Sequence, residues 1–154
     1  MQLYRTFLSW TWLVVVFSAV AFATSIAEVP LSDMLKAADV IIVGHVDKVV
    51  MVDSKGVPVV NSGAKTGPGE GHEIRLCVTL KNETIVKGSL DLKKHSVVLP
   101  LWKMWHREFG EARKYYENKN FVFLLKRDLS PSMSETFVFD EVLLPELKKK
   151  LLQK

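Results

Sequence analysis

Residues 38–52 read ADVIIVGHVDKVVMV, and this stretch decides the fold. β-Branched residues fill positions 40–43 and recur at four later positions, which is typical of a buried strand. A strand over residues 40–52 would span about 43 Å, roughly twice the usual length. Because a small domain cannot hold such a strand flat, we expect a bulge or sharp bend at Gly44. The pattern therefore predicts a curled sheet around one long, kinked first strand.

Residues 1–23 have the pattern of a secretory signal peptide. Arg5 precedes a predominantly apolar run over residues 7–22, and small-x-small cleavage sites end at Ala23 and Ala27. The run is shorter than the roughly 20 residues of a membrane-spanning helix. We therefore expect cleavage after Ala23 and export to the periplasm or the extracellular space. An uncleaved membrane anchor is the alternative. Mass spectrometry of the exported protein tests this, since a mass that retains residues 1–23 would favour the anchor.

The remaining residues, 24–154, have the length of a single domain with a core of its own. The whole chain carries 21 basic and 17 acidic residues, a net charge of +4. These charges are spread along the sequence rather than gathered in a basic patch. We therefore expect no nucleic-acid partner, and membrane contact only through residues 1–23 if they are retained.

Cys77 is the only cysteine, so an exported form has no internal disulfide. It falls in an alternating segment over residues 73–80, where a free cysteine behaves as a small apolar residue. We expect inert packing. Dimerisation through a disulfide and a reactive thiol are the alternatives.

The other elements follow from periodicity, caps and turn residues. We expect helices, strands and a flexible glycine-rich loop in this order: helix 32–38, hairpin strand 57–60, loop 61–72, strand 73–86, strand 95–99 ended by Pro100, helix 101–118, strand 121–125, strand 136–142 and a helix from Pro145. Ser32 is the expected cap of the first helix. The prediction is a mainly β fold, a five-stranded OB-like partly open barrel. Its short helices lie at the N-terminus, between strands three and four, and at the C-terminus.

Three segments, residues 38–46, 85–89 and 121–127, resemble those of a group of small, exported bacterial proteins. The resemblance covers roughly residues 31–154. It implies the OB-like barrel of netrin-type modules and tissue metalloproteinase inhibitors, and most members of the group have no assigned activity. Those inhibitors act through an N-terminal cysteine and several disulfides, which this chain lacks. The resemblance therefore supports a fold and not an inhibitory mechanism.

Trp102 and Trp105, with Lys103 and His106 beside them, form the candidate ligand site. Tryptophan rings stack on sugars or peptides, and Lys103, His106 and the nearby Arg107 could serve as polar partners. The alternative is packing, because both tryptophans fall on one helical stripe that continues through Phe109, Ala112 and Tyr116. We favour packing and keep the ligand site as the second interpretation.

No catalytic or metal-binding pattern emerges from the sequence. The four histidines, at positions 45, 72, 95 and 106, have no pair at helical or strand spacing, and the carboxylates are scattered. We predict no catalytic residues, no metal and no cofactor. The expected function is an exported, monomeric, non-catalytic binding domain for an unknown protein or cell-envelope ligand. The alternatives are an envelope-associated structural protein held by an uncleaved anchor, and a hydrolase or metal-dependent enzyme with a dispersed site.

Overall fold

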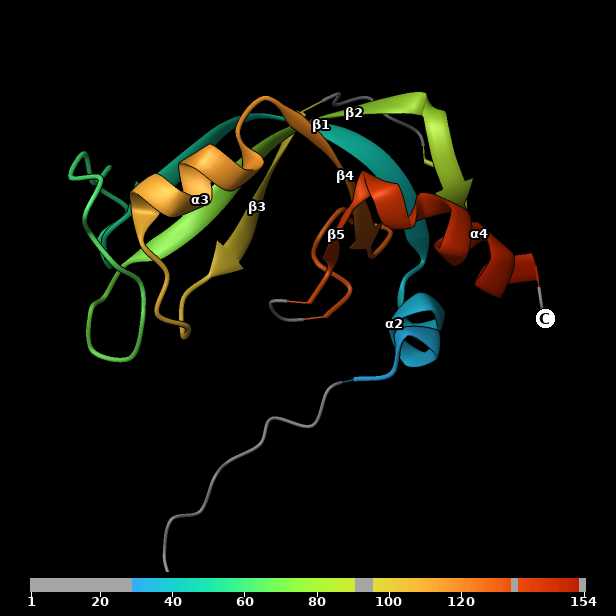
Figure 1. The fold of residues 1–154 in the computed structure, drawn as a ribbon, viewed down its shortest axis with the longest axis horizontal. Coiled ribbons are helices and arrows are strands. Elements are labelled where there is room, and N and C mark those ends of the chain that lie inside the picture. The colour runs from blue at the N-terminus through green and yellow to red at the C-terminus, as the bar shows by residue number, and fades with distance from the viewer. Residues whose placement is uncertain (1–28, 91–95, 134–135, 153–154) are drawn as a thin grey trace, which may run out of the picture.

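A computed structural model describes residues 29–90, 96–133 and 136–152, without the side chains of residues 81–83. The fold is mainly β, as predicted, with one antiparallel sheet of five strands and three short helices (Figure 1). The elements are, in chain order, α2 (Leu31–Ala37), β1 (Val40–Val52), β2 (Glu73–Lys87), β3 (Ser96–Trp102), α3 (Phe109–Tyr116), β4 (Lys119–Leu125), β5 (Val138–Asp140), the 3-10 turn η1 (Glu141–Leu143) and α4 (Leu144–Leu152).

The strands are ordered β3-β2-β1-β4-β5, so β1 lies at the centre and β3 and β5 form the two edges. Within the described residues the two edge strands do not pair with each other, and the sheet stays open. This confirms the mainly β class but not the closure of the sheet into a barrel. The curled sheet arches over the interior, with α3 at one end of the molecule and α2 and α4 at the other (Figure 1).

The long first strand is present, and its first half is buried on both faces. Its pairing with β4 runs without interruption from Val40 to Val46. The pairing of β1 with β2 is irregular between the pairs Ile42↔Ile85 and Gly44↔Leu80. Between these two pairs the chain advances five residues along β2 (85 − 80) but only two along β1 (44 − 42). The irregularity therefore falls at Gly44 as predicted, but the extra residues belong to β2, which bends sharply there (Figure 1).

Two predicted boundaries around β3 are wrong. Pro100 does not end the strand, which continues to Trp102, paired with Ile74. Because β3 is an edge strand, a proline whose missing N–H would point away from β2 removes no ladder hydrogen bond. The helix expected from residue 101 begins only at Phe109, since residues 101–102 are already committed to the sheet.

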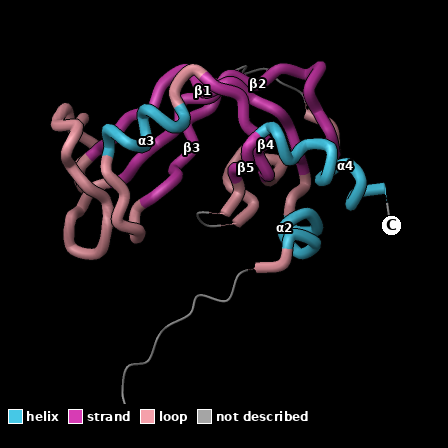
Figure 2. The backbone as a smooth tube through the Cα atoms, viewed as in Figure 1, coloured by secondary structure: helices cyan, strands magenta, loops and turns pink. Residues whose placement is uncertain are grey.

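The glycine-rich loop lies against the segment that precedes α3. Backbone N–H groups of Thr66 and Gly67 donate to the carbonyls of Arg107 (2.9 Å) and Lys103 (3.1 Å). The Thr66 side chain is fully buried and donates to the Trp105 carbonyl. Figure 2 shows these loops gathered at the α3 end of the molecule. The two segments support each other, and together they fix where the chain leaves β3.

At the opposite end, α2 and α4 cover the sheet. The first helix has no side-chain cap; its preceding residue is Pro30 and not the expected Ser32. Its carboxyl end is held by two lysines, since Lys87 Nζ donates to the Leu35 carbonyl (2.8 Å) and Lys126 Nζ to the Ala37 carbonyl (2.6 Å). Leu147 of α4 is fully buried. Among the described helices, none has the length and apolar character needed to cross a bilayer.

Candidate functional site

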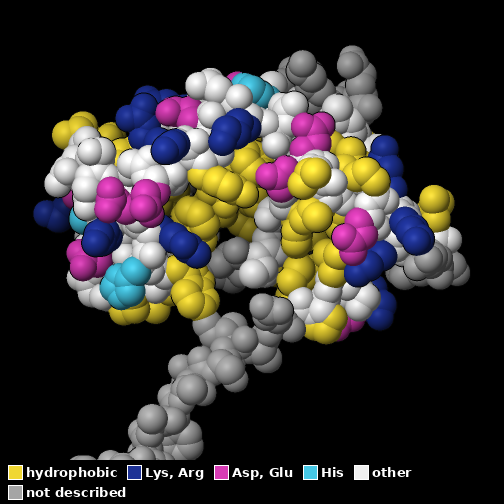
Figure 3. All heavy atoms as spheres, in the orientation of Figure 1, with side chains coloured by type: hydrophobic (Ala, Val, Ile, Leu, Met, Phe, Trp, Pro, Cys, Tyr) yellow, Lys and Arg dark blue, Asp and Glu magenta, His cyan; other side chains and the backbone are white. Residues whose placement is uncertain are grey.

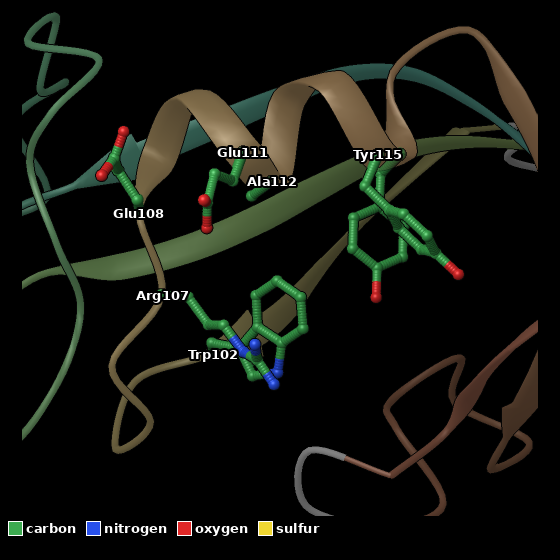
Figure 4. A pocket seen from close by; sticks show the side chains of 7 residues that line it. Trp102, Arg107, Glu108, Glu111, Ala112 and Tyr115 are labelled. Atoms are coloured by element: carbon green, nitrogen blue, oxygen red, sulfur yellow. The ribbon is translucent and has the colours of Figure 1, made fainter.

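A cavity lies between the end of β3 and α3. We call it the Trp102 cavity; its volume is about 370 Å³, and Figure 4 shows its side chains. Its lining residues are Trp102, Arg107, Glu108, Glu111, Ala112, Tyr115 and Tyr116. In the space-filling view, hydrophobic side chains border a hollow between the α3 part and the α4 part of the molecule (Figure 3).

Trp102 and Tyr116 form the aromatic base of this cavity. Trp102 is the last residue of β3, and Tyr116 is on the buried face of α3 with Phe109 and Ala112. The two rings meet edge to face, with centroids 5.5 Å apart and planes at 66°. This geometry is a favourable aromatic contact and ties the helix to the strand.

Arg107 reaches the same tryptophan from the loop before α3. Its guanidinium carbon lies 5.1 Å from the centroid of the Trp102 ring, which is a cation–π contact. Within the described residues Arg107 forms no ion pair with a carboxylate. The guanidinium is therefore held in place by stacking while its N–H donors remain available to a ligand.

Tyr115 contributes a hydroxyl group at the other end of the cavity (Figure 4), and Tyr116 also lines the cavity. Tyr115 is 51% exposed, and its ring centroid lies 4.7 Å from that of the buried Tyr116. Burial raises the pKa of Tyr116 far above its ordinary value, and the neighbouring Tyr115 adds to the shift while Arg107 opposes it. The Tyr116 phenol is therefore protonated at neutral pH and acts as a hydrogen-bond donor rather than a base.

Two carboxylates complete the lining. Glu111 is exposed, Glu108 is half-buried, and neither forms an ion pair within the part of the chain that the structure describes. Figure 4 shows the Glu111 carboxylate pointing from α3 toward the space above Trp102. The cavity thus offers aromatic faces, donors from Arg107 and acceptors from Glu111, which suits a ligand with both apolar and polar groups.

A second cavity of about 460 Å³ lies on the other side of the same tryptophan. It is lined by Glu73, Pro100, Leu101, Trp102, Lys103, Met104 and Pro131. Pro131 comes from the segment between β4 and β5. This second cavity, which we call the Pro131 cavity, therefore lies between β3 and that segment. Trp102 is therefore a wall shared by two adjoining cavities.

The structure divides the four residues predicted as a site. Trp102 and Lys103 line cavities, while Trp105 is 44% exposed and lines neither of the two. His106 packs closely against Gly67. A β-carbon added at Gly67 would lie only 2.4 Å from Nδ1 of His106. Trp102 is half-buried against Tyr116, as the packing interpretation expected of a tryptophan there, but neither tryptophan lies on the helix and Trp105 is not packed. Sequence reasoning named Arg107 as a nearby polar partner but missed Tyr115 and Glu111, which no motif marks.

Substitution of the two tryptophans separates their roles. Trp102→Ala should lower the free energy of unfolding by about 2 kcal/mol, because a half-buried ring in contact with Tyr116 and Arg107 is lost. Trp105→Ala should change it by no more than about 0.5 kcal/mol, as for other exposed side chains. Denaturant unfolding measures both. Equal midpoints for the two variants would contradict the asymmetry seen in the structure.

The described histidines and Cys77 do not line the Trp102 cavity. Among the described residues no three His, Cys, Asp or Glu side chains gather as a metal site. His45 is hydrogen-bonded to Asn120 (3.0 Å) and His72 to the Lys65 carbonyl (2.9 Å), while His95 lies outside the described residues. Among the described residues, the ionisable side chains that line the Trp102 cavity are Arg107, Glu108, Glu111, Tyr115 and Tyr116.

Cys77 is half-buried in β2, and burial raises the pKa of its thiol; Lys48 lowers it and Asp47 raises it to smaller extents. Because the thiolate is the reactive form, alkylation of the folded protein by iodoacetamide at pH 8 should be about tenfold slower than that of a cysteine in an unstructured peptide. The rate should rise as the pH approaches 10. A rate equal to that of the peptide at pH 8 would identify a reactive thiol.

No known protein-family model, characterised protein or solved structure matches this chain. Its function therefore has to be inferred from the geometry of the Trp102 cavity.

Proposed function

We propose that this chain is an exported, non-catalytic binding domain that holds its ligand in the Trp102 cavity. The single observation behind the proposal is that Trp102, Arg107 and Tyr115 meet at one concave, partly open surface. Tryptophan, tyrosine and arginine dominate binding energy in protein interfaces and line most small-molecule pockets. The ligand is a protein or a cell-envelope molecule that combines a flat apolar part with hydrogen-bonding groups.

The fold that carries this site is, in our proposal, an OB-like barrel opened between β3 and β5. Support comes from the strand order, in which β1 pairs with both β2 and β4 while the helix α3 connects β3 to β4. The five-stranded, partly open Greek-key barrel is a common binding scaffold. Both cavities that share Trp102 lie beside β3, at one edge of the opening.

The enzyme alternative has less support. A hydrolase or a metal-dependent enzyme needs a nucleophile, a base or several ligands in mutual reach. In the described part of the chain the ionisable groups of the Trp102 cavity are Arg107, Glu108, Glu111 and two tyrosines, and Tyr116 stays protonated. These groups favour recognition over proton transfer.

Site-specific photo-crosslinking tests the proposal. We place p-benzoylphenylalanine at Tyr115, on the rim of the cavity, and irradiate the protein in the organism that produces it. A matched protein carries the probe at Val57, which is 54% exposed in the loop after β1. We expect a discrete adduct at Tyr115 that is absent at Val57.

Arg107→Gln provides the second arm of this experiment, because it removes the stacked guanidinium from the cavity. Arg113→Gln is the control, since Arg113 pairs with Glu117 (3.2 Å) and lines no part of the Trp102 cavity. The adduct should be lost with Arg107→Gln and kept with Arg113→Gln. The same adducts at Tyr115 and Val57, or adducts insensitive to Arg107, would refute a ligand site here.

A further inference from the structure

We propose that the α2–α4 end of the domain docks on an anionic lipid bilayer. This end carries exposed lysines on α4, an apolar groove between the two helices, and the point at which the N-terminal segment joins the domain. The contact is separate from the Trp102 cavity and does not depend on it. Its partner is the surface of a membrane rich in negatively charged headgroups.

One face of α4 combines positive charge with exposed apolar surface. At about 100° per residue, Pro145, Lys148, Lys149 and Leu152 fall within an arc of about 100°. All four are exposed, and Leu152 is 86% exposed. The opposite face buries Leu147 against the sheet. An apolar side chain flanked by lysines is the pattern of a helix that lies in a membrane interface.

The ion pairs of this helix leave the same face free. Lys150 pairs with Glu146 (3.4 Å) on another side of the helix. Within the described residues Lys148 and Lys149 have no acidic partner. Lysine-rich segments gain affinity for anionic membranes with each basic residue near the surface.

A groove of about 400 Å³ separates α2 from α4 and adds apolar surface to this end. Leu31, Leu35 and Leu151 contribute its apolar part, and Lys36 and Lys150 lie beside them. Aliphatic side chains next to ammonium groups match the boundary between acyl chains and phosphate headgroups. Figure 3 shows basic side chains at the α4 end of the molecule as well as at the α3 end.

The entry point of the chain favours a membrane over other acidic partners. Pro30 lines the groove, so the residues that precede it join the domain at this end. That preceding sequence includes the predominantly apolar run at residues 7–22. If this run is retained in a membrane, the chain enters the domain at the α2–α4 end, so α2 and α4 lie nearest to that membrane. In this orientation α3, at the other end of the long axis (Figure 1), points toward the aqueous phase.

Helix stability alone would explain lysines in the last turn of α4, because cations there interact favourably with the helix dipole. That explanation does not require an exposed Leu152. An acidic protein would use the lysines but would not need Leu152 in the contact. The lipid surface accounts for Lys148, Lys149 and the exposed Leu152 together.

Vesicle binding by the full-length protein tests this inference. Partitioning is measured onto phosphatidylcholine vesicles and onto vesicles with 30% phosphatidylglycerol, so that insertion of residues 7–22 contributes equally to both. We expect a preference for the anionic vesicles that falls about twentyfold or more in Lys148→Glu/Lys149→Glu, at about fivefold for each lysine. The preference should also disappear at high salt.

The matched control is Lys55→Glu/Lys114→Glu, which makes the same charge change on exposed lysines away from α2 and α4. Equal melting temperatures establish that each variant is folded. The control should retain the preference. No preference in the wild type, or equal loss in both double variants, would overturn the proposal.

A probe at Leu152 separates a lipid surface from an acidic protein. An environment-sensitive dye on Leu152→Cys, in a Cys77→Ser background, should shift to the blue with anionic vesicles. Poly-glutamate should leave the dye unchanged. A response to poly-glutamate without a response to vesicles would contradict membrane docking and point to an acidic protein.

Discussion

Gly44→Val is expected to lower the free energy of unfolding by about 3 kcal/mol, the upper part of the range for overpacked cores. A β-carbon at Gly44 would lie 2.7 Å from Val78 Cγ1, 2.8 Å from Leu80 Cδ2 and 3.1 Å from Phe123 Cε2. The two residues from β2 and Phe123 from β4 are fully buried, so they have no space into which to move. Valine at position 78 is also stiff about its first side-chain torsion.

Gly63→Val is the matched control, because a β-carbon there meets only the Asn61 side chain at 3.5 Å. Its unfolding midpoint should stay within about 0.5 kcal/mol of the wild type. Denaturant unfolding of both variants separates the effect of the close approach from the general effect of replacing glycine. A Gly44→Val protein as stable as the control would show that β1, β2 and β4 are not packed as described.

Gly88→Ala should destabilise the domain by about 2–3 kcal/mol through two costs that act together. Gly88 follows β2 with φ +81°, a conformation that residues with a side chain adopt poorly. A β-carbon there would also lie 2.5 Å from the backbone carbonyl oxygen of Asp39, at the start of β1. Backbone atoms at this point cannot turn aside as a side chain does.

Gly69→Ala isolates the first of these costs, that of the backbone conformation. Gly69 has a similar φ of +85°, and no atom lies within 4 Å of the position of an added β-carbon. Gly69→Ala should therefore cost about 1 kcal/mol from the backbone conformation alone. Thermal or denaturant unfolding gives the difference between the variants, and equal losses would contradict the close contact between Gly88 and Asp39.

The strands were predictable where local pattern and tertiary structure agree. A β-branched run predicted β1, a continuous apolar run predicted β4, and clean alternation predicted β2, because each of these strands packs against neighbours that demand that pattern. Gly44 was predictable as a special position, but its reason was not. The close approach comes from Val78, Leu80 and Phe123, which are distant in sequence.

The start of α3 was not predictable, because two signals overlapped. Trp102 and Trp105 match the helical spacing of Phe109, although Trp102 belongs to β3 and Trp105 to a loop. Pairing with β2 and hydrogen bonds from the glycine-rich loop override the local periodicity. Similarly, Pro100 predicts the end of β3 unless it is known that β3 is an edge strand, where a proline is tolerated.

The site was predictable only in part for a related reason. Trp102 stood out by its type and Arg107 by its place near the tryptophans, whereas Tyr115 and Glu111 become functional candidates only once α3 lies beside the end of β3. Their convergence depends on the loop between β3 and α3, which is shaped by contacts with Thr66 and Gly67. Residue type therefore suggested one wall of the cavity, and tertiary structure provided the others.

The most direct test of the binding account follows the indole N–H signals of Trp102 and Trp105 by NMR. The protein is titrated with the molecule that crosslinks to the probe at Tyr115. We predict that the Trp102 signal shifts in a saturable manner, because this ring forms the base of the cavity, while the signal of Trp105, which lines neither cavity, stays in place. A shift of Trp105 alone, or no shift of either signal, would contradict a ligand site at the Trp102 cavity.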